Sequence, residues 1–424
     1  MPTVEPLGKT SYYNDIYGAS FRQIAMMNGH LLHTLAGARG EGMLIGVLDG
    51  GFDAADSLEA FAELRARIGI RATLDVVCPQ CDVYQEHWHG RSVLSVMAGN
   101  VRGELLGSAP NADYVLVRTE DVHTEYPVEE ENWIRGAEFA DSIGCDLLNT
   151  SLGYTQFDDS TMDHTYADLD GATLRISIAA GIASQKGMIP VQSAGNSGYS
   201  TWHFISAAAD AMDILSVGAV DVDRQVAGFS SRGPSADGRV KPDVSAVGSG
   251  TIGLGIDGLR VEGISGTSFS SPLTCGLVAC LWQLHRQKGA HEVMNAIRRS
   301  ASHYDSPNDS IGYGIPDFWR AHLLLGGEDL TALQAPQFFS VYPLPFTDHL
   351  DIELFSGEEH TIDLELWDVL GKKVLSRTVQ VEPRVYQQVR LEDARLSLLP
   401  NGSYTMRAVI GGRAEITQRL VKAP

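Results

Sequence analysis

Short apolar runs alternate with segments of helical periodicity between about residues 43 and 320. The expected strands are the apolar runs 43–48, 114–117, 146–149, 189–192 and 214–218. The expected helices are the periodic segments 90–98, 132–143, 172–186 and 270–288. Strands that follow one another at intervals of about one helix are typical of βαβ units. The pattern therefore predicts an α/β fold with a parallel sheet flanked by helices, in which functional groups gather at the carboxyl ends of the strands.

The pattern changes after residue 326, where short runs of alternating apolar and polar residues replace the helical segments. Turn-forming sequences separate these runs, so we expect a small antiparallel β-sandwich. Its expected strands are residues 350–354, 362–367, 373–377 and 404–410. The Pro-containing segment 335–345 is the predicted junction. The predicted organisation is a lead-in segment, an α/β domain and a β-sandwich domain, over residues 1–35, 36–327 and 337–424.

The composition is that of an ordinary globular chain with an excess of acid. Of the 424 residues, 44% are hydrophobic and 20% are charged, and the formal net charge is −21. A negative balance of this size argues against a nucleic-acid partner, which requires a basic surface. No apolar run reaches the length of a transmembrane segment. The N-terminus lacks the basic start and apolar stretch of a signal peptide, so the chain is either cytoplasmic or begins after a removed leader.

The five cysteines do not make a disulfide framework, because their number is odd. Cys275 and Cys280 lie in an apolar run, so we expect buried free thiols. Cys78 and Cys81 form a CxxC motif, which is compatible with half of a zinc site, a redox pair or a local disulfide. Since the sequence contains no second CxxC, the motif alone does not predict a metal site.

The densest set of hydroxyl groups lies in the stretch GISGTSFSSP over residues 263–272. The nucleophile motif G-x-S-x-G fails here, because Thr267 stands where its last glycine would be. Ser268 instead precedes a helical run. It is either an ordinary helix N-cap or a nucleophile beside backbone N–H groups that stabilise an anion. Pro272 is expected in the first turn of that helix.

A serine nucleophile needs a base and a rigidly held carboxylate. His89 is the candidate base, because Gly90 follows it and opens an apolar helical stretch. Asp49 is the candidate carboxylate, because it ends the first predicted strand; its alternative role is to cap a turn. Asn196 follows the fourth predicted strand and is the candidate donor to an oxyanion, although Asn-Ser-Gly read alone is a turn.

Together these residues resemble the signatures of subtilisin-like serine peptidases. Asp49 lies in VLDGG, His89 in HGRSVLSVMAG, Asn196 in SAGNSG and Ser268 in GTSFSSP, and their order along the chain is that of the family. The resemblance covers roughly residues 36–325. It implies a catalytic domain in which Ser268 attacks the substrate and His89 transfers the proton. Asp49 would hold the imidazole, and Asn196 with the backbone N–H of Ser268 would stabilise the oxyanion.

The resemblance also implies two segments that bind the substrate. Residues 149–153 resemble the strand and turn that line the primary specificity pocket of the family. By this resemblance, the extended backbone of the substrate would pair with two sets of residues: Ser151, Leu152 and Gly153, and Ser193, Ala194 and Gly195.

The chain departs from the family pattern at Arg91, where a small hydroxyl residue is usual. A cation close to His89 would disfavour the imidazolium that forms during catalysis. We expect Arg91 to point outward, toward Glu86 or another acid. The alternative function is a catalytically inactive subtilase fold used as a surface-binding module, with Arg91 as its sign. A third hypothesis is an esterase or a peptide ligase that uses the same site, because an acyl-enzyme formed on the serine can be resolved by other nucleophiles.

The C-terminal region resembles the sorting domains of proteins secreted by the type IX system. The resemblance implies a protein that is secreted or carried to the cell surface, with the type IX machinery as a partner. Residues 10–42 resemble the lead-in of subtilases that carry such domains. Leu344 replaces the usual Asn, and the alternative is an accessory β-sandwich. The motifs that carry the resemblance are Tyr342–Phe346, Leu370–Val374, Pro400–Tyr404 and the basic end 420–422.

The family resemblance implies no required cofactor. Members often bind calcium, and the acidic clusters Asp158-Asp159 and 168–170 are candidate ligands. Neither cluster has the EF-hand spacing, and solvated surface acids are the alternative, so we name no metal ligand. The predicted partners are protein or peptide substrates, and we expect a monomer.

Overall fold

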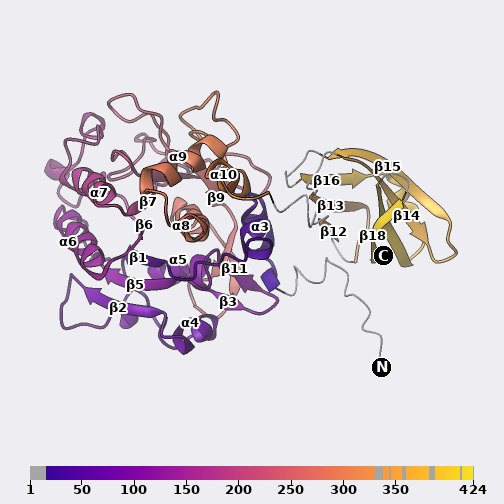
Figure 1. The fold of residues 1–424 in the computed structure, drawn as a ribbon, viewed down its shortest axis with the longest axis horizontal. Coiled ribbons are helices and arrows are strands. Elements are labelled where there is room, and N and C mark those ends of the chain that lie inside the picture. The colour runs from indigo at the N-terminus through magenta and orange to yellow at the C-terminus, as the bar shows by residue number, and fades with distance from the viewer. Residues whose placement is uncertain are drawn as a thin grey trace. The chain divides into compact units, whose positions relative to one another are not determined.

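The computed structural model describes residues 16–329, 338–342, 345–355, 360–381, 387–410 and 413–423. The chain divides into two compact units, one over Ile16–Glu328 and one in the C-terminal region from Asp329 onward (Figure 1). Parts of three sequence predictions lie outside the described residues. They are residues 1–15 of the lead-in, 335–337 of the junction, and Pro343 and Leu344, which belong to both the junction and the first sorting motif.

A seven-stranded parallel sheet forms the centre of the larger unit. Its order is β2-β5-β1-β6-β7-β8-β9, and each pair of neighbours is parallel. The five strands predicted from apolar runs are confirmed, and with them the α/β fold class. The strands are β1 (Leu44–Asp49), β2 (Ile70–Asp75), β5 (Asp113–Arg118), β6 (Leu147–Thr150), β7 (Ile189–Ser193), β8 (Leu215–Val220) and β9 (Val244–Val247).

The two strands that the sequence did not predict, β2 and β9, lie at the two edges of the sheet. In β2 every side chain except that of Asp75 is exposed or only half-buried, and its sequence IRATLD lacks a continuous apolar run. The strand β9 is buried but has four residues, two of which are the small Ser245 and Ala246. Both strands therefore lack the apolar length that marks the central strands of a parallel sheet.

Helices cover both faces of the sheet (Figure 1). The helices α5 (His89–Ala98) and α8 (Thr267–Leu284) pack on one face, and α6 (Val128–Ile143) and α7 (Arg175–Gln185) pack together on the other. The helix α8 is buried from Thr267 to Trp282, because its residues are apolar or small on all sides. All four predicted helices are confirmed. Within the described residues, no helix has the length and apolar character needed to cross a membrane.

Residues 16–35, which the sequence analysis placed in a lead-in segment, belong to the larger unit. They form α2 (Phe21–Ala25) and α3 (Gly29–Thr34), and α3 packs against α8. A side chain at Gly29 would collide with Leu277 of α8, so the two helices meet at closest approach there. The other elements of the unit are α4 (Ala62–Ala66), α9 (Ala290–Ser300), α10 (Phe318–Leu324), the hairpin β3 (Asn100–Val101) with β4 (Leu105–Leu106), and the hairpin β10 (Thr251–Leu254) with β11 (Val261–Ile264).

The C-terminal unit consists of two antiparallel sheets, in the orders β12-β13-β16 and β15-β14-β17-β18. Buried apolar residues of both sheets form one cluster, including Ile352, Leu364, Met406 and Leu420, which confirms the predicted β-sandwich. The elements are β12 (Phe338–Tyr342), β13 (His349–Phe355), β14 (His360–Asp368), β15 (Lys373–Val381), β16 (Gln387–Glu392), α12 (Ala394–Leu398), β17 (Gly402–Ile410) and β18 (Arg413–Lys422).

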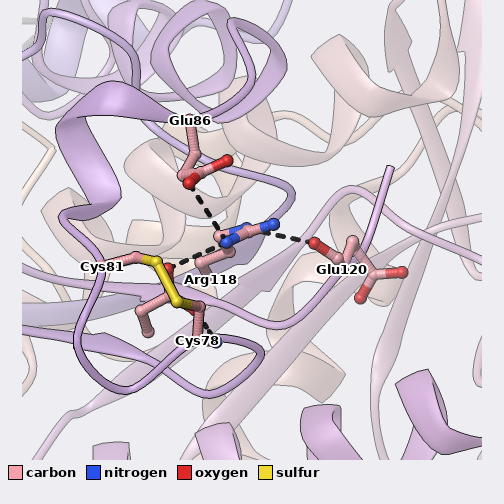
Figure 2. The surroundings of a disulfide bond; sticks show 6 residues. Cys78, Cys81, Glu86, Arg118 and Glu120 are labelled. Carbon is pink, nitrogen blue, oxygen red and sulfur yellow. Dashed lines mark hydrogen bonds and ion pairs between the residues drawn. A yellow bond between two sulfur atoms is a disulfide. The ribbon is translucent and has the colours of Figure 1, made fainter. Parts of the chain in front are cut away.

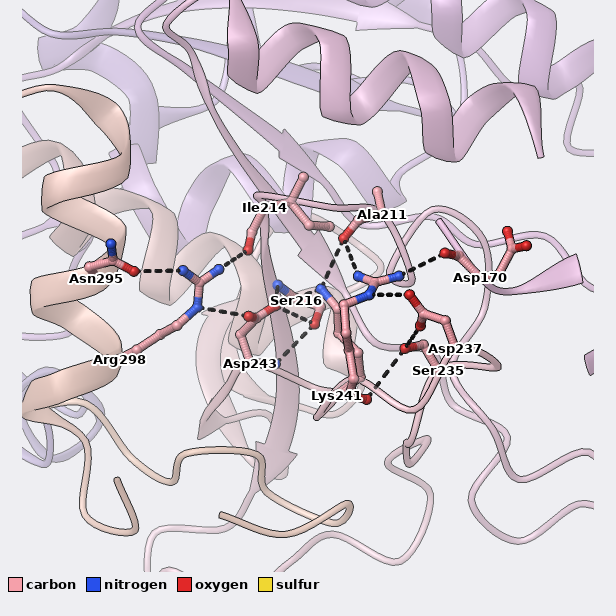
Figure 3. A network of polar contacts seen from close by, with 11 residues as sticks. Asp170, Ala211, Ile214, Ser216, Ser235, Asp237, Lys241, Asp243, Asn295 and Arg298 are labelled. Carbon is pink, nitrogen blue, oxygen red and sulfur yellow. Dashed lines mark hydrogen bonds and ion pairs between the residues drawn. The ribbon is translucent and has the colours of Figure 1, made fainter. Parts of the chain in front are cut away.

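A buried charge network joins β8, β9 and α9 (Figure 3). Asp243, at the start of β9, accepts hydrogen bonds from Lys241 Nζ and Arg298 Nε, each at 2.8 Å. It also accepts from the backbone N–H and the hydroxyl of Ser216, each at 2.9 Å. Burial alone would raise the pKa of Asp243, but the charges of Lys241 and Arg298 outweigh it and hold that pKa well below its ordinary value. The acid is therefore ionised at neutral pH and is the shared ion-pair partner of both cations.

We expect Asp243→Asn to lower the free energy of unfolding at pH 7 by about 3–5 kcal/mol, because Lys241 and Arg298 then keep buried charges without an acid. The lowered pKa of Asp243 makes its contribution present above the unfolded pKa and lost as pH falls through the folded one, so the difference should shrink in strong acid. Urea titration measures it. Asp141→Asn, which removes an exposed ion pair with Lys186, should cost about 1 kcal/mol or less. Equal losses in the two variants would refute the assignment.

Candidate active site

Asp49 is the last residue of β1 and is completely buried. Its Oδ1 accepts hydrogen bonds from the backbone N–H of Gly50 and from His89 Nδ1, each at 2.8 Å. Its Oδ2 is buried without a hydrogen-bond partner among the described residues. A buried strand end with two donors on one oxygen fixes the carboxylate in place. The sequence prediction of a rigidly held acid at the carboxyl end of a strand is confirmed in its position.

His89 begins α5 directly above the end of β1. A Cβ on Gly90 would collide with the carbonyl oxygen of Gly51 and would lie 2.8 Å from Asp49 Cβ, so only glycine lets the helix start this close to the strand. Burial alone would lower the pKa of His89. The negative charge of Asp49 and the hydrogen bond to it outweigh burial, and the pKa is raised above its ordinary value.

Ser268 lies in the first turn of α8 and is buried. The ring of the next residue, Phe269, packs against the His89 ring with centroids 5.9 Å apart, so the start of α8 and the start of α5 meet here. The Ser268 hydroxyl donates to the backbone carbonyl of Ser151 at 3.2 Å. No hydrogen bond joins it to His89 in this resting arrangement of the described residues. Such bonds are often long or poorly aligned until substrate binds, and rotation about the Cα–Cβ bond redirects the hydroxyl.

The sequence analysis placed Pro272 in the first turn of the helix, but α8 starts earlier and Pro272 is inside it. A proline there has no N–H for the carbonyl four residues before it, which is that of Ser268. This carbonyl accepts a hydrogen bond from Ser151 Oγ at 2.8 Å instead. The break in the helix therefore creates a second bond between Ser268 and Ser151, and the two residues hold each other through both.

Asn196 follows β7 and is exposed. Its Oδ1 accepts hydrogen bonds from the backbone N–H of Thr267 at 2.8 Å and from its hydroxyl at 3.0 Å. The amide is thereby anchored to the first turn of α8 by its oxygen. Its Nδ2 donates to no described residue and lies 3.7 Å from where a Cβ on Gly266 would be. A free donor thus points to the same helix end that carries Ser268.

The two predicted substrate-binding segments start side by side, because Thr150 of β6 pairs with Gln192 of β7. Both segments continue from these strand ends, and Ser193 Oγ donates to the carbonyl of Leu152 at 3.2 Å. The backbone N–H groups of Ala194 and Gly195 are bonded within the chain. In the described part of the chain, the N–H of Leu152 and both backbone groups of Gly153 have no such partner.

A cavity of about 430 Å³ opens beside Asp49, His89, Ser151 and Leu152. The segment after β5, residues 120–125, forms its opposite wall. This wall was not predicted from the sequence. Its signal was the acidic run between β5 and α6, which sequence alone does not distinguish from a solvated loop.

The CxxC motif is a disulfide between Cys78 and Cys81, beside Arg118 (Figure 2). Arg118 pairs with Asp75 at 3.0 Å and Glu86 at 3.4 Å. Its Nε donates to the backbone carbonyl of Glu120 at 3.2 Å. These contacts attach the disulfide loop, which leads to His89, to the acidic wall of the cavity.

The other sequence predictions about cysteine and metal sites have different outcomes. Cys275 and Cys280 are free and buried, as predicted. Within the described residues, the one group of possible metal ligands that lie close together is Asp75, Cys81 and Glu86. Cys81 is held in the disulfide, so it has no thiolate for a metal. The donor set therefore does not fit a metal ion.

Arg91 pairs with an acid, as predicted, but the acid is Asp53 at 2.8 Å and not Glu86. The side chain is buried rather than outward, and it also donates to the backbone carbonyls of Gly255 and Ile256. The guanidinium thus ties α5 to the loop between β10 and β11.

Both units of the chain match known protein families. The model of the subtilase family matches residues 40–314, and that of a secretion system C-terminal sorting domain matches residues 340–423. Membrane-bound transcription factor site-1 protease of Mus musculus is 30% identical over 271 residues, which are 61% of this chain and 24% of that protein. Bacillopeptidase F of Bacillus subtilis is 27% identical, over 57% of this chain and 17% of that protein. The chain therefore spans about a quarter or less of these relatives.

Solved structures with the same fold include a protease domain and a second protein. The self-cleaved protease domain of PatA has a TM-score of 0.54 at 24% identity, and covers 69% of this chain and 100% of that one. MycP1 from Mycobacterium smegmatis has a TM-score of 0.54 at 19% identity, over 76% of this chain and 87% of that one. At these identities the likeness concerns the fold.

We expect His89 to titrate above its ordinary pKa of 6.5 in the folded Ser268→Ala protein, as measured by NMR of its ring nitrogens. In Asp49→Asn the attraction is lost and burial remains, so the pKa should fall below 6.5. Asp158→Asn removes another carboxylate that lines the same cavity without touching His89, and should leave the titration in place. An unchanged His89 titration in Asp49→Asn would show that the carboxylate does not control the imidazole.

Proposed function

We propose that this chain, which belongs to the subtilase family, is a serine endopeptidase that uses Asp49, His89 and Ser268. The observation that carries the proposal is the hydrogen bond of His89 Nδ1 to the buried Asp49, formed where the starts of α5 and α8 meet. An imidazole oriented in this way, beside a serine at a helix start, is the arrangement that nucleophilic acyl transfer requires.

In the proposed reaction, Ser268 Oγ attacks the carbonyl carbon of the scissile bond while His89 Nε2 takes the hydroxyl proton. His89 then protonates the leaving amine, and water releases the acyl group by the reverse steps. Because Nδ1–H is donated to Asp49, the lone pair of the neutral ring lies on Nε2. The reaction needs His89 to be neutral at the start, so activity should rise with pH through the raised pKa of His89.

Two donors would stabilise the oxyanion: Asn196 Nδ2 and the backbone N–H of Ser268. The support for this role is that Asn196 is held by its oxygen alone, which leaves the amide nitrogen available. Ser151–Gly153 would pair with the substrate backbone through its unbonded groups. The N–H groups of Ala194 and Gly195 are already bonded within the chain, so they are not available to pair with the substrate backbone. Ser193–Gly195 would instead form the other wall of the primary specificity pocket.

The rival function, an inactive binding module, rested on a cation near His89. Arg91 is held by Asp53 and by backbone carbonyls between β10 and β11, which favours the enzyme over the rival. An esterase or ligase would use the same three residues, and no observation favours either. The proposed hydrolysis requires no cofactor, because protein side chains supply every proton transfer; for calcium we propose no ligands.

The C-terminal sorting domain indicates a secreted or cell-surface protein. We extend this to export by the type IX machinery, with protein or peptide substrates met outside the cell. A monomer is sufficient for the proposed chemistry, since residues of a single chain make up the site.

We expect a fluorophosphonate probe to label the full chain and expect labelling to vanish in Ser268→Ala, because the probe reacts only with an activated serine. Ser265→Ala is the matched control: this exposed hydroxyl lies on the same stretch and accepts from the N–H of Gly250, and its loss should leave labelling intact. Gel fluorescence and mass spectrometry of the labelled peptide measure this. Absence of labelling in a protein with cooperative thermal unfolding would support the inactive module.

We expect Asn196→Ala to lower kcat by about 10²–10³ with little change in KM, because the donor acts on charge that develops in the transition state. The variant also loses the contacts to Thr267. Thr267→Val is therefore the control, since it removes the hydroxyl bond to Asn196 but keeps the amide nitrogen, and it should cost much less. Steady-state kinetics on a peptide substrate separate the two parameters. Equal losses of kcat in the two variants would show that Asn196 only anchors the start of α8.

A further inference from the structure

The cavity beside His89 is lined by an excess of acid. Six carboxyl side chains contribute to it: Asp49, Glu120, Asp121, Glu125, Glu129 and Asp158. Among the described residues, no lysine or arginine lines it, and its basic groups are three histidines. The nearby Arg118 is already paired with two other acids. The acids of the cavity therefore have no matching lysine or arginine among the described residues that line it.

Glu129, in the first turn of α6, is 2% exposed and lines this cavity. Its Oε1 accepts from the backbone N–H of Asp121 at 2.9 Å. Its Oε2 is buried and has no hydrogen-bond partner among the described residues. An unsatisfied buried carboxylate oxygen is costly, so a donor supplied from the cavity would be stabilising.

Glu120 is the second buried acid of the wall. Its Oε1 accepts from the hydroxyls of Thr119 at 2.6 Å and Tyr154 at 2.7 Å. Burial raises the pKa of Glu120 to about 8 and that of Glu129 to about 7, and it also raises that of Glu125. Glu120 and Glu129 therefore hold protons near neutral pH, and a cation placed among these acids would favour their ionised forms.

Three other titratable groups around the wall do not supply that cation. His87 and His123 line the cavity, and burial lowers the pKa of His87, so that ring is neutral at neutral pH. Glu130, on the same helix as Glu129, is paired with His164 at 2.6 Å. His89 is hydrogen-bonded to Asp49.

We propose that this cavity binds the cationic side chain of a lysine or arginine of the substrate. The inference rests on the proposed function, which places the substrate backbone along Ser151–Gly153. In that proposal the primary specificity pocket would lie between this segment and Ser193–Gly195. The acidic cavity adjoins His89, Ser151, Leu152 and the wall 120–125, so it would receive a side chain close to the scissile bond other than the one in the primary specificity pocket.

A metal ion fits the cavity less well. Metal ligands must gather around a point, but among the described residues no three carboxylates of the cavity have oxygens within 4.8 Å of one another. Acids spread around a cavity of about 430 Å³ suit an extended organic cation, whose several N–H donors reach different acceptors.

The test is cleavage profiling of a peptide library by the full chain at pH 8, followed by kinetics on two matched peptides. The peptides differ only in arginine or neutral citrulline at the position found by profiling. We expect kcat/KM for arginine to exceed that for citrulline by about tenfold or more, the size of a charge-assisted hydrogen bond. The ratio should rise between pH 6 and pH 8.5 as the acids ionise. Taking a ratio cancels effects common to both peptides, including the titration of His89.

Glu129→Gln, and separately Glu120→Gln, should reduce the arginine-to-citrulline ratio toward one. Glu138→Gln, on an exposed position of the same helix, is the matched control and should keep the full ratio. Thermal unfolding checks that each variant is folded. Cleavage of peptides without preference for lysine or arginine overturns this inference and leaves the proposed function standing. A preference for cations that survives both glutamate variants overturns it too.

Two further outcomes distinguish this inference from a metal site in the cavity and from a failure of the proposed function. If activity depends on added calcium and is removed by a chelator, while arginine and citrulline peptides react equally, the cavity is a metal site and the inference fails. If no peptide is cleaved and Ser268 is not labelled, the proposed function itself fails, and this inference falls with it.

Discussion

The site depends on how closely the start of α5 approaches the end of β1. Asp49 ends a buried strand and His89 starts a helix, and their hydrogen bond at 2.8 Å forms only if the two backbones nearly touch. Gly90 allows this, because any Cβ there would collide with the carbonyl of Gly51. Gly51 itself has φ of 144°, which a side chain would strain. The imidazole is thus oriented by backbone packing that no flexible loop can relax.

The nucleophile end of the site is held by a different device. Pro272 interrupts the hydrogen bonds of α8, and the carbonyl that it frees belongs to Ser268. Ser151, just after β6, satisfies that carbonyl and accepts the Ser268 hydroxyl through its own carbonyl. The helix start is therefore tied to the strand end along which the substrate is proposed to lie. A substrate that binds to Ser151 would also affect the direction in which the Ser268 hydroxyl points. The contact between these two serines therefore links substrate recognition to catalysis.

The central strands, the four helices and the positions of Asp49, His89, Asn196 and Ser268 could be predicted, because apolar runs and glycine-rich motifs are local. What could not be predicted depends on contacts between distant segments. The outward direction of Arg91 was wrong, because only the fold shows that the loop between β10 and β11 covers its side chain, while Asp53 supplies the acid and Glu86 pairs with Arg118. The burial of the acids after β5 was missed for the same reason. An acidic run looks solvated until a second segment covers it.

The chain shows two ways to bury carboxylates, and the difference between them is informative. Asp243 is surrounded by Lys241 and Arg298, which hold its pKa well below the ordinary value, so that the fold supplies its own counter-charge. Glu129 and Glu120 are buried as well, yet their pKa values are raised, because burial dominates and no cation among the described residues pairs with them. The fold places two cations beside the buried Asp243, but it places no lysine or arginine among the described residues that line the cavity beside Glu120 and Glu129. The missing charge is one that a substrate side chain can bring.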